Sequence, residues 1–352
     1  MTTHPASTPG RDSGIRSAPA ARSGIARSSF AAPTPPALPR ILLARDYPSD
    51  VVRREVKQGR WLKVRRGAYV TSDGVAWAGA DPAARRALHL ARVAAVAAQV
   101  SCEAVISHQS AALVWGLPLW SSPRAVHVTQ PHPESSLRSG DIVRHRNALR
   151  PEDVGSCTGL RVTSLARTLV DCATTLPPLA GLVTADAALR AGADAAAVDE
   201  LLGSFAGRRG VRLGRMVARQ ADARSESPGE SAVRFILWAY GFPTPQLQVP
   251  IGTRLGVFWV DLGWLEWGLM IEYDGLVKYR ELAGGAPSEV VVAEKRRQDA
   301  IEEEGCRVLR VTRADLRPPS VLVARVLRRA PHGRPLRLSP TPELIESLRS
   351  TL

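Results

Sequence analysis

The chain has 352 residues, enough for two or three domains, and 45% of them are hydrophobic. Its net charge is +14 and its sequence pI is about 10.6. This excess of positive charge favours an acidic partner, and composition alone leaves DNA, RNA and an acidic membrane surface open. No apolar run is long enough to span a bilayer, so the sequence predicts no integral membrane segment.

Residues 1–38 are rich in Ala, Ser, Pro and Arg and lack the apolar stretch of a signal peptide. A transit peptide shares this composition, but the Ala, Arg and Pro bias runs through the whole chain. We therefore expect a disordered basic arm. The scattered cysteines form no CxxC pair and no zinc spacing, which predicts reduced, buried thiols in a cytoplasmic protein: Cys102, Cys157, Cys172 and Cys306.

Residues 39–80 have the pattern of a winged helix-turn-helix. Ser49 is a suitable helix N-cap, Gly59 a suitable end, and the stretch WLKVRRGAYV alternates like a hairpin that turns at Gly67. Such a unit places a helix in the major groove and a basic wing along the phosphates. An ordinary helix and hairpin with a solvated basic face has the same pattern. The candidate DNA-binding residues are Arg53, Arg54, Lys57, Lys63, Arg65 and Arg66.

A middle region, residues 81–222, mixes helices and short strands. A helix begins at Asp81-Pro82, SHQSAALVWGLP is a helix capped by Ser107, and AVHVTQ is a strand. His108 fits a capping or core role better than that of a catalytic base. Arg167 and Asp171 lie one turn apart on a helix, which predicts an ordinary ion pair.

Residues 223–330 show the regular order α-β-β-β-α-β, which predicts a mixed sheet flanked by helices, and residues 331–352 are expected to be a tail. The whole chain is therefore expected to be a multi-domain α/β protein. The first helix of this region is GESAVRFILWAYG, and the three strands after it are PQLQVPI, VFWVDLGW and GLMIEYDG. The second helix, VVVAEKRRQDAIEEEG, is followed by the strand CRVLRVT.

The second and third of these strands bring acidic residues together. If residues 265–268 form the loop, Trp264 pairs with Leu269 and Asp261 lies directly opposite Glu272, with Asp274 on the same face. Like charges this close need a cation or a basic side chain between them, and hard divalent cations prefer carboxylate oxygens. A slip of one residue would move Asp261 to the other face.

The opposite face is expected to be apolar, which argues that these are not solvated edge strands. The residues assigned to it are Phe258, Val260, Leu262, Leu269 and Ile271, with Trp259 and Met270 on the acidic face.

Residues 225–316 resemble PD-(D/E)XK nucleases, in particular the branch related to very-short-patch repair endonucleases. The resemblance rests on Glu230, VDLGW with Asp261, and IEYDG with Glu272 followed by Lys278. It implies a restriction-endonuclease-like fold with Mg²⁺ or Mn²⁺ held by Asp261 and Glu272, supported by Glu230. Asp274 joins the metal set, and Gln248 is a weaker candidate for the same site.

One position departs from that family. The usual lysine, two residues after the second acid, is Asp274 here, and Lys278 stands four residues further on. Lys278 would orient the attacking water or stabilise developing phosphorane charge. A degenerate nuclease that binds without cutting is the alternative.

The front of the chain resembles AbiEi-type antitoxins over about residues 40–190, through GRWLKVRRGAYV, SHQSAALVWGL and VTSLARTLVDCA. This implies a DNA-binding winged helix and leaves a toxin partner open. Two functions follow as hypotheses. One is a metal-dependent endonuclease, for which cutting both strands favours a homodimer; the other is a non-catalytic, antitoxin-like regulator.

Overall fold

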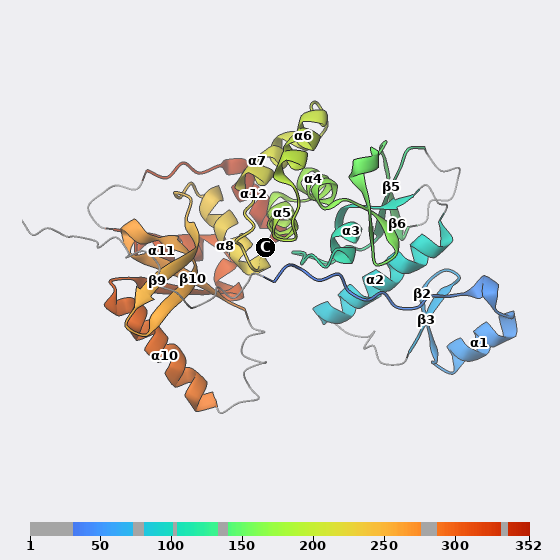
Figure 1. Cartoon of the computed structure of the whole chain (residues 1–352), viewed down its shortest axis with the longest axis horizontal. Coiled ribbons are helices and arrows are strands. Elements are labelled where there is room, and N and C mark those ends of the chain that lie inside the picture. The colour runs from blue at the N-terminus through green and yellow to red at the C-terminus, as the bar shows by residue number, and fades with distance from the viewer. Residues whose placement is uncertain (1–30, 73–80, 101–103, 133–139, 276–286, 332–336) are drawn as a thin grey trace, which may run out of the picture.

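The computed structural model describes residues 31–72, 81–100, 104–132, 140–275, 287–331 and 337–352, with side chains of the last long helix from Val292 onward. The described residues form eleven α-helices and three sheets, which confirms the predicted multi-domain α/β class. The N-terminal and C-terminal sheets lie at opposite ends of the molecule, and the helices of the middle region lie between them (Figure 1). No helix in the described part of the chain is long and apolar enough to cross a membrane.

The N-terminal sheet has the order β1-β3-β2. The α-helix of this region follows β1 in the sequence and precedes β2. Gly59 and Gly67 both have positive φ, near 70°, where the chain leaves the helix and where the hairpin turns. The predicted cap at Ser49 is wrong: Pro48 is the N-cap and Ser49 the first helical residue. The elements are β1 (Leu42–Leu43), η1 (Ala44–Asp46), α1 (Ser49–Lys57), β2 (Trp61–Arg65) and β3 (Ala68–Thr71).

This sheet packs against α2 (Pro82–Gln99), the first helix of the predicted middle region. Val64 and Val70 of the hairpin share a buried cluster with Ala91 and Ala95 of α2. No gap in packing therefore separates the described residues on either side of position 80. Within the predicted arm, residues 31–38 form neither helix nor strand, and a Cβ on Gly116 would lie 2.2 Å from the Thr34 carbonyl oxygen.

The middle region builds a five-stranded sheet with the order β6-β5-β4-β8-β7 and a group of helices. The predicted strand AVHVTQ and the helices after Asp81 and Ser107 are confirmed. The strands are β4 (Val105–Ile106), β5 (Val126–Gln130), β6 (Ile142–Arg146), β7 (Val154–Cys157) and β8 (Leu160–Thr163). Helical elements are α3 (His108–Val114), η2 (Pro151–Asp153), α4 (Leu165–Thr175), α5 (Pro178–Arg190), α6 (Ala195–Ser204) and α7 (Val211–Gln220).

The C-terminal sheet has the order β12-β11-β10-β9, with β11 and β12 parallel and the other pairs antiparallel. The predicted α-β-β-β-α-β order is confirmed. Its members are α8 (Pro228–Ala239), β9 (Gln246–Thr253), β10 (Gly256–Trp264), η3 (Leu265–Trp267), β11 (Leu269–Asp274), α10 (Pro287–Glu303) and β12 (Arg307–Thr312). Three further helical elements follow: η5 (Arg313–Leu316), α11 (Pro319–Leu327) and α12 (Pro342–Thr351).

The predicted pairing of β10 with β11 is confirmed, because Trp264 pairs with Leu269 and Leu262 with Ile271. The predicted apolar face is wrong in part. Its members Leu262, Leu269 and Ile271 do lie in the cluster that includes α8, whereas Phe258 and Val260 lie with Met270 in the cluster that includes Ile301 of α10. Both faces of the sheet are thus covered by a helix.

The cause is an irregularity between β9 and β10. The pairing of β9 with β10 is interrupted between the pairs Val260–Val249 and Leu262–Leu247. Gln248, which lies in this gap, has a left-handed φ of 51°. A non-glycine residue in this conformation breaks the simple alternation of a strand. Residues before and after Asp261 consequently pack on opposite faces of the sheet.

Helix α12 was not predicted, and it joins the middle and C-terminal regions. Leu344 and Leu348 are buried in the same apolar cluster as residues of α5 and α8.

The three cysteines in the described residues are buried thiols, as predicted, and Cys102 lies outside the described residues.

Candidate functional site

A cleft of about 1150 Å³, here called the central cleft, opens where α2 faces the C-terminal sheet. Residues from α2 and from the connection before β5 form one side, and the start of α8 with β10, β11 and η5 forms the other. The charged and hydrogen-bonding residues that line it are Arg85, His89, Arg92, Ser121, Ser122, Arg124, Glu226, Ser227, Glu230, Asp261, Tyr273 and Arg313.

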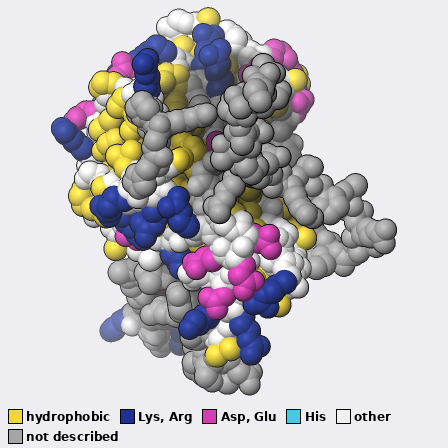
Figure 2. All heavy atoms as spheres, turned by 90° about the vertical axis from the view of Figure 1, so that its left-hand side faces the viewer, with side chains coloured by type: hydrophobic (Ala, Val, Ile, Leu, Met, Phe, Trp, Pro, Cys, Tyr) yellow, Lys and Arg dark blue, Asp and Glu magenta, His cyan; other side chains and the backbone are white. Residues whose placement is uncertain are grey.

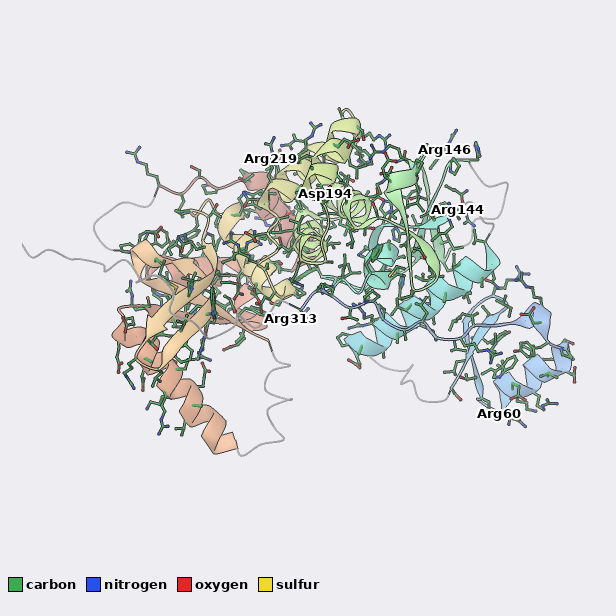
Figure 3. All side chains as sticks on the ribbon, viewed as in Figure 1. Arg60, Arg144, Arg146, Asp194, Arg219 and Arg313 are labelled. Carbon is green, nitrogen blue, oxygen red and sulfur yellow. The ribbon has the colours of Figure 1, made fainter. Side chains whose placement is uncertain are left out.

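Four arginines, from both sides, give the central cleft a positive lining. Arg85, Arg124 and Arg313 are exposed and Arg92 is partly exposed. Among the described residues no ion pair engages any of the four; Arg313 lies over the Trp120 ring at 5.9 Å. Figure 3 places Arg313 where the C-terminal part of the chain faces the centre of the molecule. Guanidinium groups in this setting are suited to phosphate oxygens.

Glu230 lies at the first turn of α8 and is only 5% exposed. Its carboxylate accepts hydrogen bonds from the Glu226 backbone N–H and the Ser227 hydroxyl, both at 2.8 Å, so Glu230 closes a capping arrangement with Ser227. Burial, followed by the nearby negative charge of Asp261, raises the pKa of Glu230 to about 8.

Asp261 of β10 is the partner of Glu230 in the cleft. Its Oδ2 accepts a hydrogen bond of 2.7 Å from the backbone N–H of Tyr273 on β11, which holds the carboxylate at this edge of the strand pair. The Tyr273 ring packs on the start of α8, because a Cβ on Gly229 would lie 1.9 Å from its Cε1. The structure therefore brings together two of the predicted site residues, Glu230 and Asp261.

Glu272 is held away from this pair. Its Oε1 binds Arg297 of α10, and its Oε2 lies 3.7 Å from Arg310 of β12. Arg310 also lies 3.6 Å from Asp274. Basic side chains thus neutralise Glu272 and lie between it and Asp274, one of the two solutions that the sequence allowed. The ligand atoms of Asp261, Glu272 and Asp274 do not form a group compact enough for one metal ion.

Lys278 lies outside the described residues, so its role stays a prediction. Gln248 is 6% exposed and its Nε2 has no hydrogen-bond partner in the described structure. It is not among the residues that line the central cleft.

The candidate DNA-binding residues fall into two groups. Arg53, Arg54, Lys57, Lys63 and Arg66 are exposed on α1 and the hairpin. Arg65 differs, because its side chain is only 10% exposed and binds Asp141 at 2.9 Å and Gln99 at 2.7 Å. Figure 3 shows Arg60, beside α1, at the end of the molecule far from Arg313.

Three histidines form a cluster that the sequence did not predict. His108, His127 and His145 have ring nitrogens within 4.8 Å of one another, and they form the one such metal-sized group among the described His, Cys, Asp and Glu residues. Burial lowers the pKa of His108 and of His145 to about 3, and it also lowers that of His127. All three rings are therefore neutral at pH 7. No spacing in the sequence points to them, because they come from three separate elements.

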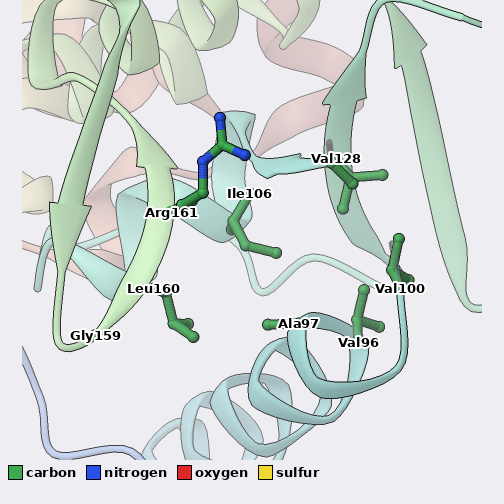
Figure 4. Close-up of a pocket in the computed structure, with 9 residues that line it drawn as sticks. Val96, Ala97, Val100, Ile106, Val128, Gly159, Leu160 and Arg161 are labelled. Carbon is green, nitrogen blue, oxygen red and sulfur yellow. The ribbon is translucent and has the colours of Figure 1, made fainter. Parts of the chain in front are cut away.

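Two other surfaces are less suited to a polyanion. A cavity of about 200 Å³ beside the end of α2 is lined mainly by apolar side chains, with Arg161 at its edge (Figure 4). Figure 2 looks at the end of the molecule that carries the C-terminal sheet, where acidic and basic side chains lie next to one another. In this C-terminal region Arg254 of the β9–β10 turn and Glu303 of α10 form an exposed ion pair of 2.7 Å.

The middle of the chain matches a known protein family. Residues 100–220 match the family described as the AbiEi antitoxin C-terminal domain. This stretch holds the five-stranded sheet and helices α3 to α7, and it ends before α8. It overlaps the region where the sequence resembles AbiEi-type antitoxins.

The chain is similar to proteins of Mycobacterium tuberculosis. Two uncharacterized proteins, MT2308 and Rv2248, are 29% identical to it over 283 residues, which is 80% of this chain and 96% of each relative. The crystal structure of the RV2827C protein from the same organism covers 60% of this chain and 83% of its own, at 16% identity and a TM-score of 0.36.

Proposed function

We propose that the protein binds DNA in the central cleft and hydrolyses a phosphodiester bond at Glu230 and Asp261. The observation that carries the proposal is that one cleft contains both four arginines outside the described ion pairs and a close pair of carboxyl groups. Arginines bind phosphates through charge-assisted hydrogen bonds, and paired carboxylates are the usual donors to catalytic divalent cations.

The carboxyl pair fits a divalent cation. Glu230 and Asp261 repel one another enough to help raise the pKa of Glu230 to about 8, and a cation between them would remove that repulsion. Glu272 does not fit as a ligand while Arg297 and Arg310 hold its carboxylate. Glu230 and Asp261 would therefore hold Mg²⁺ or Mn²⁺, which when bound polarises phosphate oxygens and lowers the pKa of water.

The side chains of this protein supply the positioning. Arg85, Arg92, Arg124 and Arg313 would hold the phosphates of the bound strand along the cleft. The Tyr273 N–H keeps the Asp261 carboxylate in place, so the acid does not have to reorganise when substrate arrives. Lys278 would stabilise the charge that develops on the phosphate.

The test is incubation of the protein with plasmid and short duplex DNA in Mg²⁺, Mn²⁺ or EDTA. We expect metal-dependent cutting that falls at least about 100-fold in Asp261→Asn, the size typical for loss of a charge-stabilising group, while DNA binding is kept. Lys278→Ala should also lose cutting. Glu266→Gln is the matched control, because Glu266 is an exposed acid in the loop after β10. Cutting by Asp261→Asn at the wild-type rate would show that the site is misplaced.

A second candidate function is a DNA-binding regulator that does not cut. Two observations favour it: Arg297 and Arg310 neutralise Glu272, and residues 100–220 match an antitoxin domain. In this case α1 and the hairpin supply the recognition surface, the C-terminal sheet serves in binding alone, and a cognate toxin is a further partner.

The regulator is tested by changing Arg53, Arg54 and Lys57 together to Ala. All three are exposed, so we expect weaker DNA binding. The slope of log affinity against log salt concentration should become smaller by up to about 3, because each lost charge removes one phosphate contact. A control with Arg209, Arg219 and Arg328 changed to Ala removes the same charge from other exposed sites. An unchanged affinity and slope in the first variant would exclude α1 as the DNA-contacting helix.

A further inference from the structure

The His108, His127 and His145 cluster joins three elements of the middle region. His108 is the first residue of α3, His127 lies on β5 and His145 on β6. In the parallel pairing of β5 with β6, His145 lies opposite Thr129, two residues after His127. Side chains two residues apart on a strand share a face, so both strand histidines point to the face that α3 covers.

The cluster is held by unusual local structure. His108 has a φ of 52°, in the left-handed region that few non-glycine residues adopt, and this conformation occurs directly after the N-cap Ser107. The His127 Nδ1 and His145 Nε2 are 2.9 Å apart, and the His108 ring stacks on that of His145 with centroids 3.5 Å apart. Strained backbone at a buried polar cluster is typical of binding sites rather than of ordinary cores.

Polar groups behind His108 suit the outer shell of a metal site. Its Nδ1 is 3.0 Å from the Ser107 hydroxyl and 3.8 Å from Oδ2 of Asp171 on α4. That Oδ2 is buried and has no hydrogen-bond partner, whereas Oδ1 accepts from Arg167 at 2.9 Å. Metal-binding histidines usually present their second nitrogen to such a hydroxyl or carboxylate, and this leaves Nε2 for the metal.

We propose that His108, His127 and His145 bind one divalent transition-metal ion of the zinc class, at a site separate from the central cleft. Neutral imidazoles are ligands for Zn²⁺, Co²⁺, Ni²⁺ and Cu²⁺, whereas Mg²⁺ prefers oxygen. Zinc bonds of about 2.0 Å to nitrogen place tetrahedral ligand nitrogens about 3.3 Å apart. The ring that donates in the hydrogen bond between His127 Nδ1 and His145 Nε2 would carry its proton on its other nitrogen once the metal is bound, so that both facing nitrogens present lone pairs to the ion.

Binding requires the His108 ring to turn about its Cβ–Cγ bond, because stacked rings do not aim their lone pairs at one point. This torsion is broad in histidine, so the turned ring stays within its allowed conformations. Once bound, the ion would tie the start of α3 to β5 and β6. The expected role is structural, since the ion would crosslink three elements of the antitoxin-like region and stabilise the folded state by mass action.

The experiment uses the full chain, freed of metal by dialysis against a chelator and then titrated with Co²⁺ and with Zn²⁺ in excess Mg²⁺, which occupies the carboxyl pair of the central cleft and not the imidazoles. We expect one equivalent of Co²⁺ per chain with visible ligand-field absorption, and a rise in Tm of about 5 °C with either ion. The variant with His127→Gln and His145→Gln should lose both responses. His132→Gln is the matched control, because His132 is exposed just after β5, and it should behave like wild type.

The outcomes separate the proposal from its alternatives. Wild type that binds less than about a tenth of an equivalent and shows no rise in Tm would mean that the cluster is only a hydrogen-bonded core. Retained Co²⁺ absorption in the double variant would mean that the metal binds elsewhere. If the double variant does not fold by circular dichroism, the single variant His145→Gln is measured, and unchanged binding there would equally overturn the proposal.

Discussion

At the N-terminus of α8, Glu230 combines a structural and a chemical role. It closes the capping arrangement with Ser227, and it is nearly buried beside Asp261. Burial and this neighbour favour its protonated form, so its pKa of about 8 lies far above the 4.5 of a free glutamate. The residue is therefore poised to change its charge near neutral pH or when a cation arrives.

The pKa of Glu230 predicts how stability depends on pH. Because the folded state holds this proton up to about pH 8 and the unfolded chain loses it near 4.5, its contribution is complete below pH 4.5 and is lost as pH rises to about 8. In Glu230→Gln this loss of stability should disappear. Between pH 5 and pH 8 the free energy of unfolding of the variant should therefore rise by on the order of 3 kcal/mol relative to that of wild type. Urea unfolding at both pH values measures this.

Glu226→Gln is the control for that measurement, because Glu226 lines the same cleft and is exposed. It should keep most of the pH dependence of wild type, because the charge of Glu226 contributes least to the raised pKa of Glu230. Addition of Mg²⁺ at pH 8 should stabilise wild type and not Glu230→Gln. Parallel pH profiles for wild type and Glu230→Gln would contradict the burial of an ionisable carboxyl at this position.

At the scale of elements, the central cleft depends on how α8 sits on β11. Gly229 lets the helix approach the Tyr273 ring, and Ser231 and Arg234 on the same helix bind the buried Asp186 of α5 at 2.6 and 2.8 Å. Asp186 also accepts from the Asp222 N–H at 2.8 Å. The first turns of α8 are thus fixed between the sheet and the middle region.

This packing predicts that Gly229→Ala is destabilising. The added Cβ would meet the Tyr273 ring at 1.9 Å, so the ring must move, and overpacking of this kind costs about 1–3 kcal/mol. Gly203→Ala is the matched control: it lies in α6 with nothing within 4 Å, so it should stabilise by up to about 1 kcal/mol. Denaturant unfolding compares the two.

The cause can be isolated with a second change. Adding Tyr273→Ala to Gly229→Ala removes the clash, so the double variant should be more stable than the sum of the single effects predicts. Strict additivity would show that α8 and β11 are not in the close contact described.

At the scale of the whole molecule, the predicted boundary near residue 222 is not a gap in the core. One apolar cluster contains Leu182 and Val183 of α5, Phe235 and Ile236 of α8, and Leu344 of α12. Helix α12 is further tied to the middle region by the Trp120 Nε1–H, which donates to the Thr351 carbonyl at 3.0 Å. The cleft walls are therefore parts of one packed body in the described residues.

This shared core predicts that the two regions unfold together. Leu344→Ala with Leu348→Ala should cost about 2–5 kcal/mol for each leucine, because both are almost fully buried. The variant should still unfold in a single transition, at a lower denaturant concentration, and tryptophan fluorescence and circular dichroism should report the same midpoint. Leu327→Ala is the control at a 41% exposed leucine and should cost little. Separate transitions by the two probes would show that the regions are independent.

The sequence by itself determined the α-β-β-β-α-β order of the C-terminal region, the pairing of Trp264 with Leu269, and the places of Glu230 on the first helix and Asp261 on the second strand. Those features depend on local periodicity, on turn residues such as Gly268, and on pairing across a short loop. Burial of the cysteines could also be predicted, because their spacing provides neither a CxxC pair nor a zinc site.

Only the tertiary structure decided which residues meet. The left-handed Gln248 opposite Asp261 changes the pleat, so Asp261 joins Glu230 whereas Glu272 binds Arg297 of α10. Such an irregularity leaves no trace in the alternation of side chains. His108, His127 and His145 likewise meet only because α3 packs on the face that β5 and β6 share. Convergence of distant residues is set by packing, and one-dimensional patterns do not record it.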